Sequence, residues 1–162
     1  MIIKKRKIII GFLTILPMVL AWWLFLSDSA RINGVIKSTK QGIENRDIEK
    51  TLRYVSDGYR DVYGNRYANI KEFFERFFKN SPEINIFVIR KKKDISKNTA
   101  TVIIRVIINT SSKRYGPVRG QEFIKLGFRK IRKRGWICTS GQILERDPFK
   151  VPRGVFTPSQ AL

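Results

Sequence analysis

The chain has 162 residues, of which 33 are lysine or arginine and 13 are aspartate or glutamate, so its formal net charge at pH 7 is +20. This surplus predicts a salt-sensitive attraction to anionic partners. The sequence holds no histidine and a single cysteine, Cys138, which excludes an intramolecular disulfide and a cysteine-based metal site and removes the usual transition-metal ligand. We therefore expect no metal and no cofactor.

The first 26 residues predict attachment to a membrane. A basic cluster, Lys4-Lys5-Arg6-Lys7, precedes the uncharged stretch Ile8 to Leu26, and a helix of that length would span roughly 28 Å, close to the roughly 30 Å of a bilayer core. We predict a cytoplasmic tail (1–7) and one transmembrane helix (8–26); the alternatives are a cleaved signal peptide and a buried soluble helix. Because the basic cluster abuts the N-terminal side of the span, the domain is expected to be extracytoplasmic, on the cell (inner) membrane.

The residues after Leu26 suffice for one compact domain, expected over 27–146. Its first half has helical spacing of apolar residues. The predicted elements are a helix over Ser29–Glu44, a second helix with Asp47 as N-cap and Ile48, Leu52 and Val55 on one face, and a short strand or turn over Tyr59–Tyr63.

A third helix is predicted to begin near Asn69 and Glu72, which have capping-box spacing. Four phenylalanines follow, and we expect them to supply as much as half of a core. The helix should end at Asn80-Ser81-Pro82, because proline disfavours a helical conformation in the residue before it.

From Ile84 onward the apolar period changes to two and β-branched residues dominate, which predicts a sheet. Short connections, at 96–98 and at Arg134-Gly135, and a loop over 111–120 favour an antiparallel meander. The stretch Val102–Ile108 is apolar on both faces except at Arg105 and should be a central strand. An extended tail is expected over 147–162. The predicted strands are Ile84–Lys93, Ala100–Asn109, Gln121–Lys133 and Gly135–Arg146.

This order of elements resembles the nuclear transport factor two-like superfamily, a cone-shaped α+β fold. The stretch from Gly42 to Glu49, followed by Tyr59-Arg60-Asp61 and Gly64, is similar to polyketide-cyclase-like members, as are Ala100-Thr101-Val102 and Gly135-Trp136-Ile137. The resemblance covers about residues 42 to 145 and implies an α+β fold, with about three helices on a curved antiparallel sheet (a cystatin-like cone). A single anchor before such a domain also resembles the inner-membrane assembly component of type IV secretion systems.

Enzymes of this superfamily, such as ketosteroid isomerase, place an acid or base inside the cone. Asp61 is a candidate general base and Glu122 a candidate catalytic acid or base. For Asp61, however, a turn-stabilising hydrogen bond is favoured, and for Glu122 a cross-strand contact with a basic neighbour. Cys138 has no histidine to activate it and is interpreted as a small buried hydrophobe. We assign no catalytic residue and do not expect an enzyme. The candidate polar residues of the cone are Tyr54, Tyr59, Asp61, Arg105 and Glu122.

Two basic runs flank the first and third connections of the predicted meander, which lie at the same end of such a sheet. We predict that they converge on a basic rim that binds an anionic partner, with about 1 kcal/mol for each lysine near an anionic surface. The alternative is a solvated basic edge that only blunts strand pairing. The basic rim consists of Arg90, Lys91, Lys92, Lys93, Lys97, Arg129, Lys130, Arg132, Lys133 and Arg134.

The sequence thus predicts a membrane-anchored, non-catalytic interaction or assembly subunit of an envelope membrane complex. Expected partners are membrane lipids, other subunits of the complex, and an anionic lipid or an acidic protein at the basic rim. The alternatives are a domain that binds an anionic lipid or small amphiphile in the cone and, as a weaker hypothesis, a cyclase-like or isomerase-like enzyme. Nucleic acid is expected only with the inverted orientation, and neither basic run carries the interleaved aromatic residues of a single-strand binder.

Overall fold

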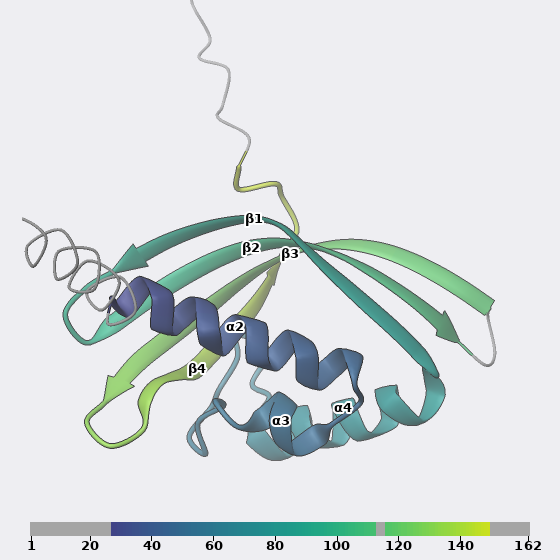
Figure 1. Cartoon of the computed structure of the whole chain (residues 1–162), viewed down its shortest axis with the longest axis horizontal. Helices are drawn as coiled ribbons and strands as arrows, with labels where there is room; N and C mark the ends of the chain where they lie inside the picture. Colours follow the sequence, from purple (N-terminus) through teal and green to yellow (C-terminus); the bar gives the residue numbers. More distant parts are fainter. Residues whose placement is uncertain (1–26, 113–115, 150–162) are drawn as a thin grey trace, which may run out of the picture.

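The computed structural model describes residues 27–112 and 116–149 (Figure 1). The predicted cytoplasmic tail, the predicted transmembrane helix over 8–26 and residues 150–162 of the predicted C-terminal tail lie outside the described residues. Among the helices that are described, none combines the length and the apolar character that a membrane span requires.

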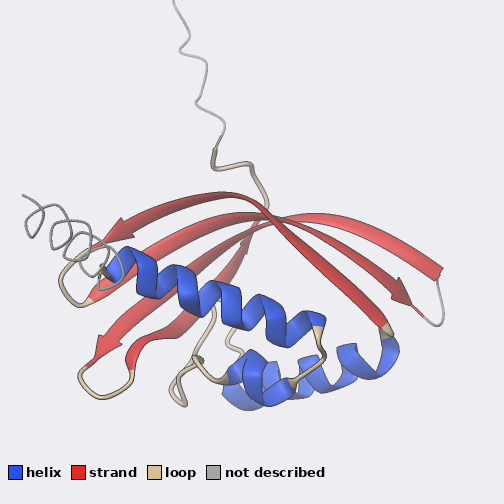
Figure 2. Ribbon diagram, viewed as in Figure 1, coloured by secondary structure: helices blue, strands red, loops and turns tan. Residues whose placement is uncertain are grey.

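Three helices and a four-stranded sheet make up the described part of the chain. The helices are α2 (Asp28–Glu44), α3 (Ile48–Leu52) and α4 (Tyr67–Asn80), and they precede β1 (Glu83–Ile95), β2 (Thr99–Ser112), β3 (Gly116–Ile131) and β4 (Gly135–Leu144). The strands pair antiparallel in the order β1-β2-β3-β4, which confirms the meander and the central place of β2. Figure 2 shows all three helices on the concave side of the curved sheet.

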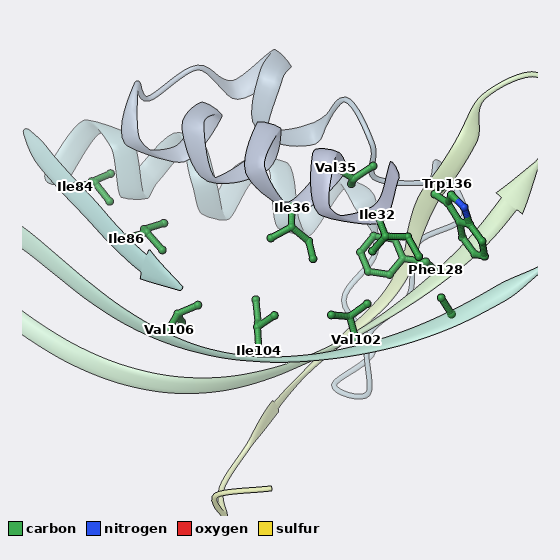
Figure 3. Packing of buried hydrophobic residues seen from close by; sticks show 11 residues of the cluster. Ile32, Val35, Ile36, Ile84, Ile86, Val102, Ile104, Val106, Phe128 and Trp136 are labelled. Carbon is green, nitrogen blue, oxygen red and sulfur yellow. The ribbon is translucent and has the colours of Figure 1, made fainter. Parts of the chain in front are cut away.

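The core lies between α2 and the concave face of the sheet (Figure 3). Ile32, Val35 and Ile36 follow one another at helical spacing and are buried. They meet alternate residues of β2, because successive side chains of a strand point to opposite faces. At about 1.5–3 kcal/mol for each fully buried side chain, this contact is the main source of stability. The sheet residues of the buried cluster are Ile84, Ile86, Ala100, Val102, Ile104, Val106, Phe128 and Trp136.

The first helix begins at Asp28, one residue before the predicted start, and the predicted N-cap of the second helix is confirmed. Ser27 caps α2, and its hydroxyl accepts a hydrogen bond from the N–H of Ala30 at 3.2 Å. Asp47 caps α3 through the N–H of Lys50 at 2.8 Å, as predicted for an acidic N-cap.

The second helix is shorter than predicted. It ends at Leu52, because the backbone after it pairs with the outer edge of β4: the N–H of Cys138 donates to Tyr54 O at 2.7 Å, and the N–H of Ser56 donates to Cys138 O at 2.9 Å. This pairing covers the β4 edge of the sheet. The stretch Tyr59–Tyr63, predicted as a short strand or turn, forms turns with an isolated bridge between Arg60 and Arg66.

The aromatic helix α4 differs most from expectation. It begins at Tyr67, and Asn69 stands in its first turn, where its side chain accepts from the N–H of Arg66 at 2.9 Å. No residue of α4 is buried; Phe77 and Phe78 touch only the margin of the core, and Phe73 is 53% exposed. The prediction that its phenylalanines would form half of the core is wrong, because α2 already occupies the concave face.

The strands are longer than predicted around the second connection. Ser111 pairs with Pro117 and Ser112 with Gly116, so the expected ten-residue loop is mostly β-ladder and only residues 113–115 join the strands. Backbone pairing makes this region part of the sheet, although its sequence lacks the apolar alternation that predicts strands. At the other end of β3 and β4, a turn with Gly135 at φ +73° connects them, as predicted.

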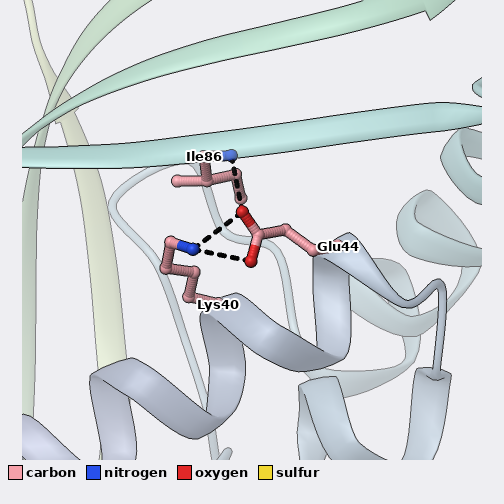
Figure 4. Close-up of polar contacts among 3 residues, drawn as sticks. All are labelled: Lys40, Glu44 and Ile86. Atoms are coloured by element: carbon pink, nitrogen blue, oxygen red, sulfur yellow. Dashed lines mark hydrogen bonds and ion pairs between the residues drawn. The ribbon is translucent and has the colours of Figure 1, made fainter.

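A carboxylate from α2 binds the outer edge of β1 (Figure 4). Glu44 accepts a hydrogen bond from the N–H of Ile86 at 2.9 Å and pairs with Lys40 at 2.6 Å. An edge strand with free N–H groups invites pairing with another chain. Glu44 therefore both fixes the end of α2 on the sheet and removes one donor from its open edge.

Candidate functional site

The first and third connections of the sheet meet, as the meander predicts. The N–H of Lys130 donates to Asn98 O, in the first connection, at 2.9 Å, and Thr99 pairs with Arg129. The structure therefore brings Lys91, Lys92 and Lys93, near the end of β1, and Lys97 to the same end of the sheet as the basic residues from 129 to 134. All of these side chains are exposed except Lys93 and Lys130, which are partly buried.

Arg90 is the one member of the predicted rim that lies elsewhere. A bulge between Val88 and Arg90 shifts the register, and Arg90 pairs with Arg105 in the middle of β2. Five residues of strand separate it from Ile95, or roughly 16 Å. Its guanidinium lies 5.1 Å from the ring centroid of Phe149. Arg90 is thus part of the convex face of the sheet, and its assignment to the rim is corrected.

The first turn of α2 is tied into this basic end. The carboxylate of Asp28 pairs with Lys130 Nζ at 2.8 Å and accepts a hydrogen bond from Trp136 Nε1 at 3.0 Å. These two hydrogen bonds, that of Lys130 before that of Trp136, lower the pKa of Asp28 below its ordinary value of 3.8. An acid at the start of a helix is also favoured by the helix dipole.

Two further rim lysines reach α2 from β1. Lys93 Nζ donates to the hydroxyl of Ser29, and Lys91 Nζ lies 3.3 Å from Asn33 Oδ1. Burial, followed by the nearby charge of Lys91, lowers the pKa of Lys93. Because side chains alternate along a strand, Lys92 points away from α2. The rim therefore wraps around the end of the sheet, with charges on both faces.

The chain consequently enters the domain inside the basic rim. Ser27 and Asp28 are the first described residues, and Asp28 is bonded to the rim itself. Sequence reasoning assigned no contact to Asp28. The available signal was an acid directly after that segment in a chain with 33 basic and 13 acidic residues.

Arg134 lies at the side of the rim, beside a hollow of about 490 Å³ between α3 and the β3–β4 turn. Its guanidinium is 3.5 Å from Asp57, and both side chains are largely exposed, so this pair adds little to stability. Glu49 and Asp57 line the hollow together with Arg53 and Arg134. Its mixed charge makes it a poorer anion site than the rim.

The tyrosines and Asp61 among the candidate cone residues have structural roles. Tyr54 and the buried Tyr59 adjoin β4, and burial raises the pKa of Tyr59 to about 12. Asp61 accepts hydrogen bonds from the N–H of Tyr63 at 2.9 Å and of Asn65 at 2.8 Å. Although burial acts in the opposite direction, a hydrogen bond from the Asn65 side chain at 2.7 Å, followed by these backbone hydrogen bonds, lowers the pKa of Asp61. This is the turn-stabilising role that was favoured for it.

Arg105 and Glu122 lie on opposite faces of the sheet. Arg105 alternates with the buried Ile104 and Val106, so it lies on the convex face, where it donates to Gln121 at 2.7 Å; its placement in the cone is corrected. Glu122 is on the concave face but pairs with Val106, so its expected basic cross-strand neighbour is absent from that position. Cys138 is partly exposed as a residue, but burial of its thiol raises the pKa to about 12.

No family model matches the chain, and no match was found among curated proteins. Solved structures do resemble it. A nuclear transport factor 2 (NTF2-like) superfamily protein from Salmonella enterica serovar Typhimurium superposes with a TM-score of 0.66 at 13% identity, over 78% of this chain and 96% of that one. A proposed dehydratase of the NTF2-like family from Streptomyces avermitilis gives 0.63 at 13% identity, over 72% and 94%.

A protein with a cystatin-like fold from Nostoc punctiforme superposes with a TM-score of 0.53 at 14% identity, over 69% of this chain and 86% of that one. At such identities the likeness concerns the fold and carries no activity. The described part of the chain therefore has the cone-shaped α+β fold of NTF2-like and cystatin-like proteins, as the sequence resemblance implied.

Proposed function

We propose that the protein is a membrane-anchored, non-catalytic interaction module of an envelope complex, held with its basic rim against an anionic membrane surface. The observation that carries this proposal is the bond between Asp28 and Lys130 at 2.8 Å, because it fixes the point where the chain enters the domain inside the rim. An anchor that ends at Leu26 would therefore place the basic rim beside the membrane surface.

Distances support the proposal. Leu26 and Asp28 are two residues apart, so the chain between them can extend at most about 7 Å. That is shorter than the screening length of about 8 Å at physiological ionic strength. Rim lysines would then lie within the field of the headgroups, where each contributes on the order of 1 kcal/mol. The anchor supplies the attachment, and the rim sets the orientation of the domain.

The chemistry of the polar candidates favours an interaction role. A general base works best with a pKa near the operating pH, whereas the pKa of Asp61 is lowered and that of Tyr59 is raised to about 12. The Cys138 thiol, with its pKa of about 12, stays protonated at neutral pH. Glu122 is the remaining carboxyl candidate on the concave face.

The test uses the full chain in its host membrane. Membranes are washed with alkaline carbonate and then dissolved in mild detergent at low and high salt, and co-purifying proteins and lipids are identified by mass spectrometry. We expect the chain to resist carbonate, to retain protein partners in detergent, and to lose anionic lipids at high salt.

Matched charge reversals separate the rim from net charge. K97E/K133E alters two exposed rim lysines, and K37E/K79E alters two exposed lysines on α2 and α4 by the same charge. Only the rim variant should lose anionic lipids. Extraction of the wild type by carbonate would reject the anchor, and equal lipid loss in both variants would reject the rim.

A second candidate function, binding of a small amphiphile, is favoured by α4. Phe73 stacks on Phe77 at 5.9 Å with a 6° interplanar angle, yet Phe73 is largely exposed. An apolar ligand could complete the cover of this aromatic face, as lipid identification in the same experiment would show. A stoichiometric lipid that survives high salt and is lost in F73S would favour this function over the assembly role.

A further inference from the structure

In the described part of the chain, no helix lies on the convex face of the sheet (Figure 1). What crosses it is the short segment after β4. Its Phe149 ring lies 6.4 Å from the ring of Phe123 on β3, and Arg90 of β1 lies 5.1 Å from the Phe149 centroid. The face thus already holds one aromatic ring of its own chain between an arginine and a phenylalanine.

Beside this ring, residues 27–112 and 116–149 leave the face open. Phe87 is 51% exposed and Ile89, at the β1 bulge, is 52% exposed. Large apolar side chains that gather in one area, instead of being scattered singly, mark an interaction site. Phe87 pairs with Ile107, and Ile107 is only partly buried, so the apolar area continues onto β2.

Positive charge surrounds the apolar area. Arg90 pairs with Arg105, and Ile103, between Lys92 and Lys125, pairs with both. The acids that strand alternation places on this face, Glu83 and Asp94, stand at the two ends of β1, and Asp147 lies two residues before Phe149 in the segment after β4. The convex patch is defined as Phe87, Ile89, Arg90, Lys92, Arg105 and Lys125.

The guanidinium of Arg105 has unused bonding capacity. It donates to Gln121 and lies 5.8 Å from the Phe123 ring centroid, but its Nε is buried without an acceptor in residues 27–112 and 116–149. A buried donor without a partner costs about 1–3 kcal/mol. A carboxylate on this arginine would relieve that cost after a small rotation of the side chain.

We propose that the convex patch is the docking surface for an acidic protein partner that presents aromatic side chains beside carboxylates. The aromatic groups would pack on Phe87 and Ile89 as Phe149 packs on Phe123, and the carboxylates would pair with the surrounding arginines and lysines. This proposal rests on the proposed interaction function, for which it names the class of partner. It does not depend on the membrane anchor.

A second copy of the chain is a poorer occupant. Two convex patches face to face would bring four positive side chains from each copy together, and like charges at such a contact are destabilising. Charge complementarity instead calls for an acidic surface. Single-stranded nucleic acid shares the negative charge and carries bases that stack on aromatic side chains, so the test below includes it as a competing occupant.

The test measures binding of the purified full chain, in a neutral detergent, to three fluorescent probes: a random glutamate–tyrosine copolymer, polyglutamate of equal length, and oligo-dT. Wild type should bind the copolymer at least ten-fold more tightly than polyglutamate. The variant F87S/I89S should lose that preference, and R90E/K125E should weaken binding of both polypeptides.

Two matched controls isolate the patch. V62S/V118S removes two apolar side chains that are similarly exposed, 60% and 45%, and K97E/K133E removes charge from the rim; both should keep the ten-fold preference. Unfolding midpoints check that every variant is folded. Because this readout is affinity for a polypeptide in micelles, it can fail independently of membrane attachment and of lipid binding at the rim.

Three outcomes would overturn the proposal. An unchanged preference in F87S/I89S would overturn the proposal, since binding would then be unspecific attraction to net charge. Tighter binding of oligo-dT than of the copolymer would overturn it in favour of nucleic acid. A concentration-dependent dimer that F87S/I89S abolishes, measured by sedimentation, would overturn it in favour of self-association.

Discussion

The two faces of the four-stranded sheet differ in how deeply their side chains are buried. On the concave face Val102, Ile104 and Val106 are sealed under α2, while on the convex face their neighbours along β2, Ile103, Arg105 and Ile107, stay partly exposed. The period of two puts the buried core on one side and the surface that we propose for recognition on the other. Substitutions on the two faces should therefore separate folding from binding.

The largest effect is expected where the concave face meets α2. Ile32 is fully buried, and Ile32→Ala should lower the free energy of unfolding by about 2–5 kcal/mol, because the side chain is lost and a cavity is left. Urea titration of the full chain in detergent measures this. Val62→Ala, at an exposed site, should change it by less than about 0.5 kcal/mol. Equal effects at the two sites would contradict the assignment of the core.

The next largest effect should come from the contact between α2 and α3. A Cβ on Gly42 would lie 2.5 Å from the backbone nitrogen of Thr51, so Gly42→Ala should cost about 1–3 kcal/mol by overpacking. Gly34, in the same helix, has open space around it. Gly34→Ala should therefore stabilise the protein by about 0.5–1 kcal/mol, and thermal unfolding would reveal the opposite signs. Destabilisation by both would show that helix geometry, not the α3 contact, limits this site.

At the basic end, Asp28→Ala should be more harmful than Asp28→Asn. Alanine leaves the buried Trp136 N–H without an acceptor, at about 1–3 kcal/mol, whereas asparagine keeps an acceptor and loses only the charge. Because the pKa of Asp28 is lowered in the folded state, its contribution is present above the ordinary value of 3.8 and is lost as pH falls through the folded pKa.

Unfolding free energies measured between pH 2 and pH 7 test this prediction. The acid-side loss of stability should be smaller in Asp28→Asn than in the wild type. A pH profile that is unchanged in Asp28→Asn would contradict the role of the Lys130 pair.

The smallest effect is expected at the β1 edge. Glu44→Ala removes the acceptor of the Ile86 N–H and should cost about 1 kcal/mol, while Glu44→Gln keeps an acceptor and should cost less. Hydrogen exchange at the Ile86 amide should accelerate in the alanine variant and much less in the glutamine variant. Equally slow exchange in both variants would show that the Ile86 amide is protected by something other than Glu44.

The sequence predicted the meander, because β-branched residues and a period of two indicated the strands and the connections between them are short. It failed at α4, where Phe73, Phe74, Phe77 and Phe78 have an ideal helical spacing, since amphipathicity cannot tell which of two helices takes the concave face. It also failed at Arg90, because a single bulge changes the register of everything after it and leaves no mark in the composition.

The basic rim was predictable from the topology, since a meander places alternate connections at one end. The role of Asp28 was not, because its bonds to Lys130 and Trp136 join residues about a hundred positions apart. The convex patch was not predicted either, for a related reason. Phe87, Arg105 and Phe123 belong to three strands, so aromatic and basic residues that are not interleaved in the chain are interleaved across the sheet.

The orientation of the domain relative to the membrane can be measured directly. Burial keeps the pKa of the Cys138 thiol at about 12, so a fluorescent maleimide should select cysteines introduced at exposed sites. Full chains carrying Lys97→Cys or Lys133→Cys at the rim, or Val62→Cys or Lys79→Cys away from it, are placed in nanodiscs whose anionic lipids carry headgroup quenchers. The account predicts strong quenching at 97 and 133 and weak quenching at 62 and 79. Equal quenching at all four positions, or the reverse order, would contradict it.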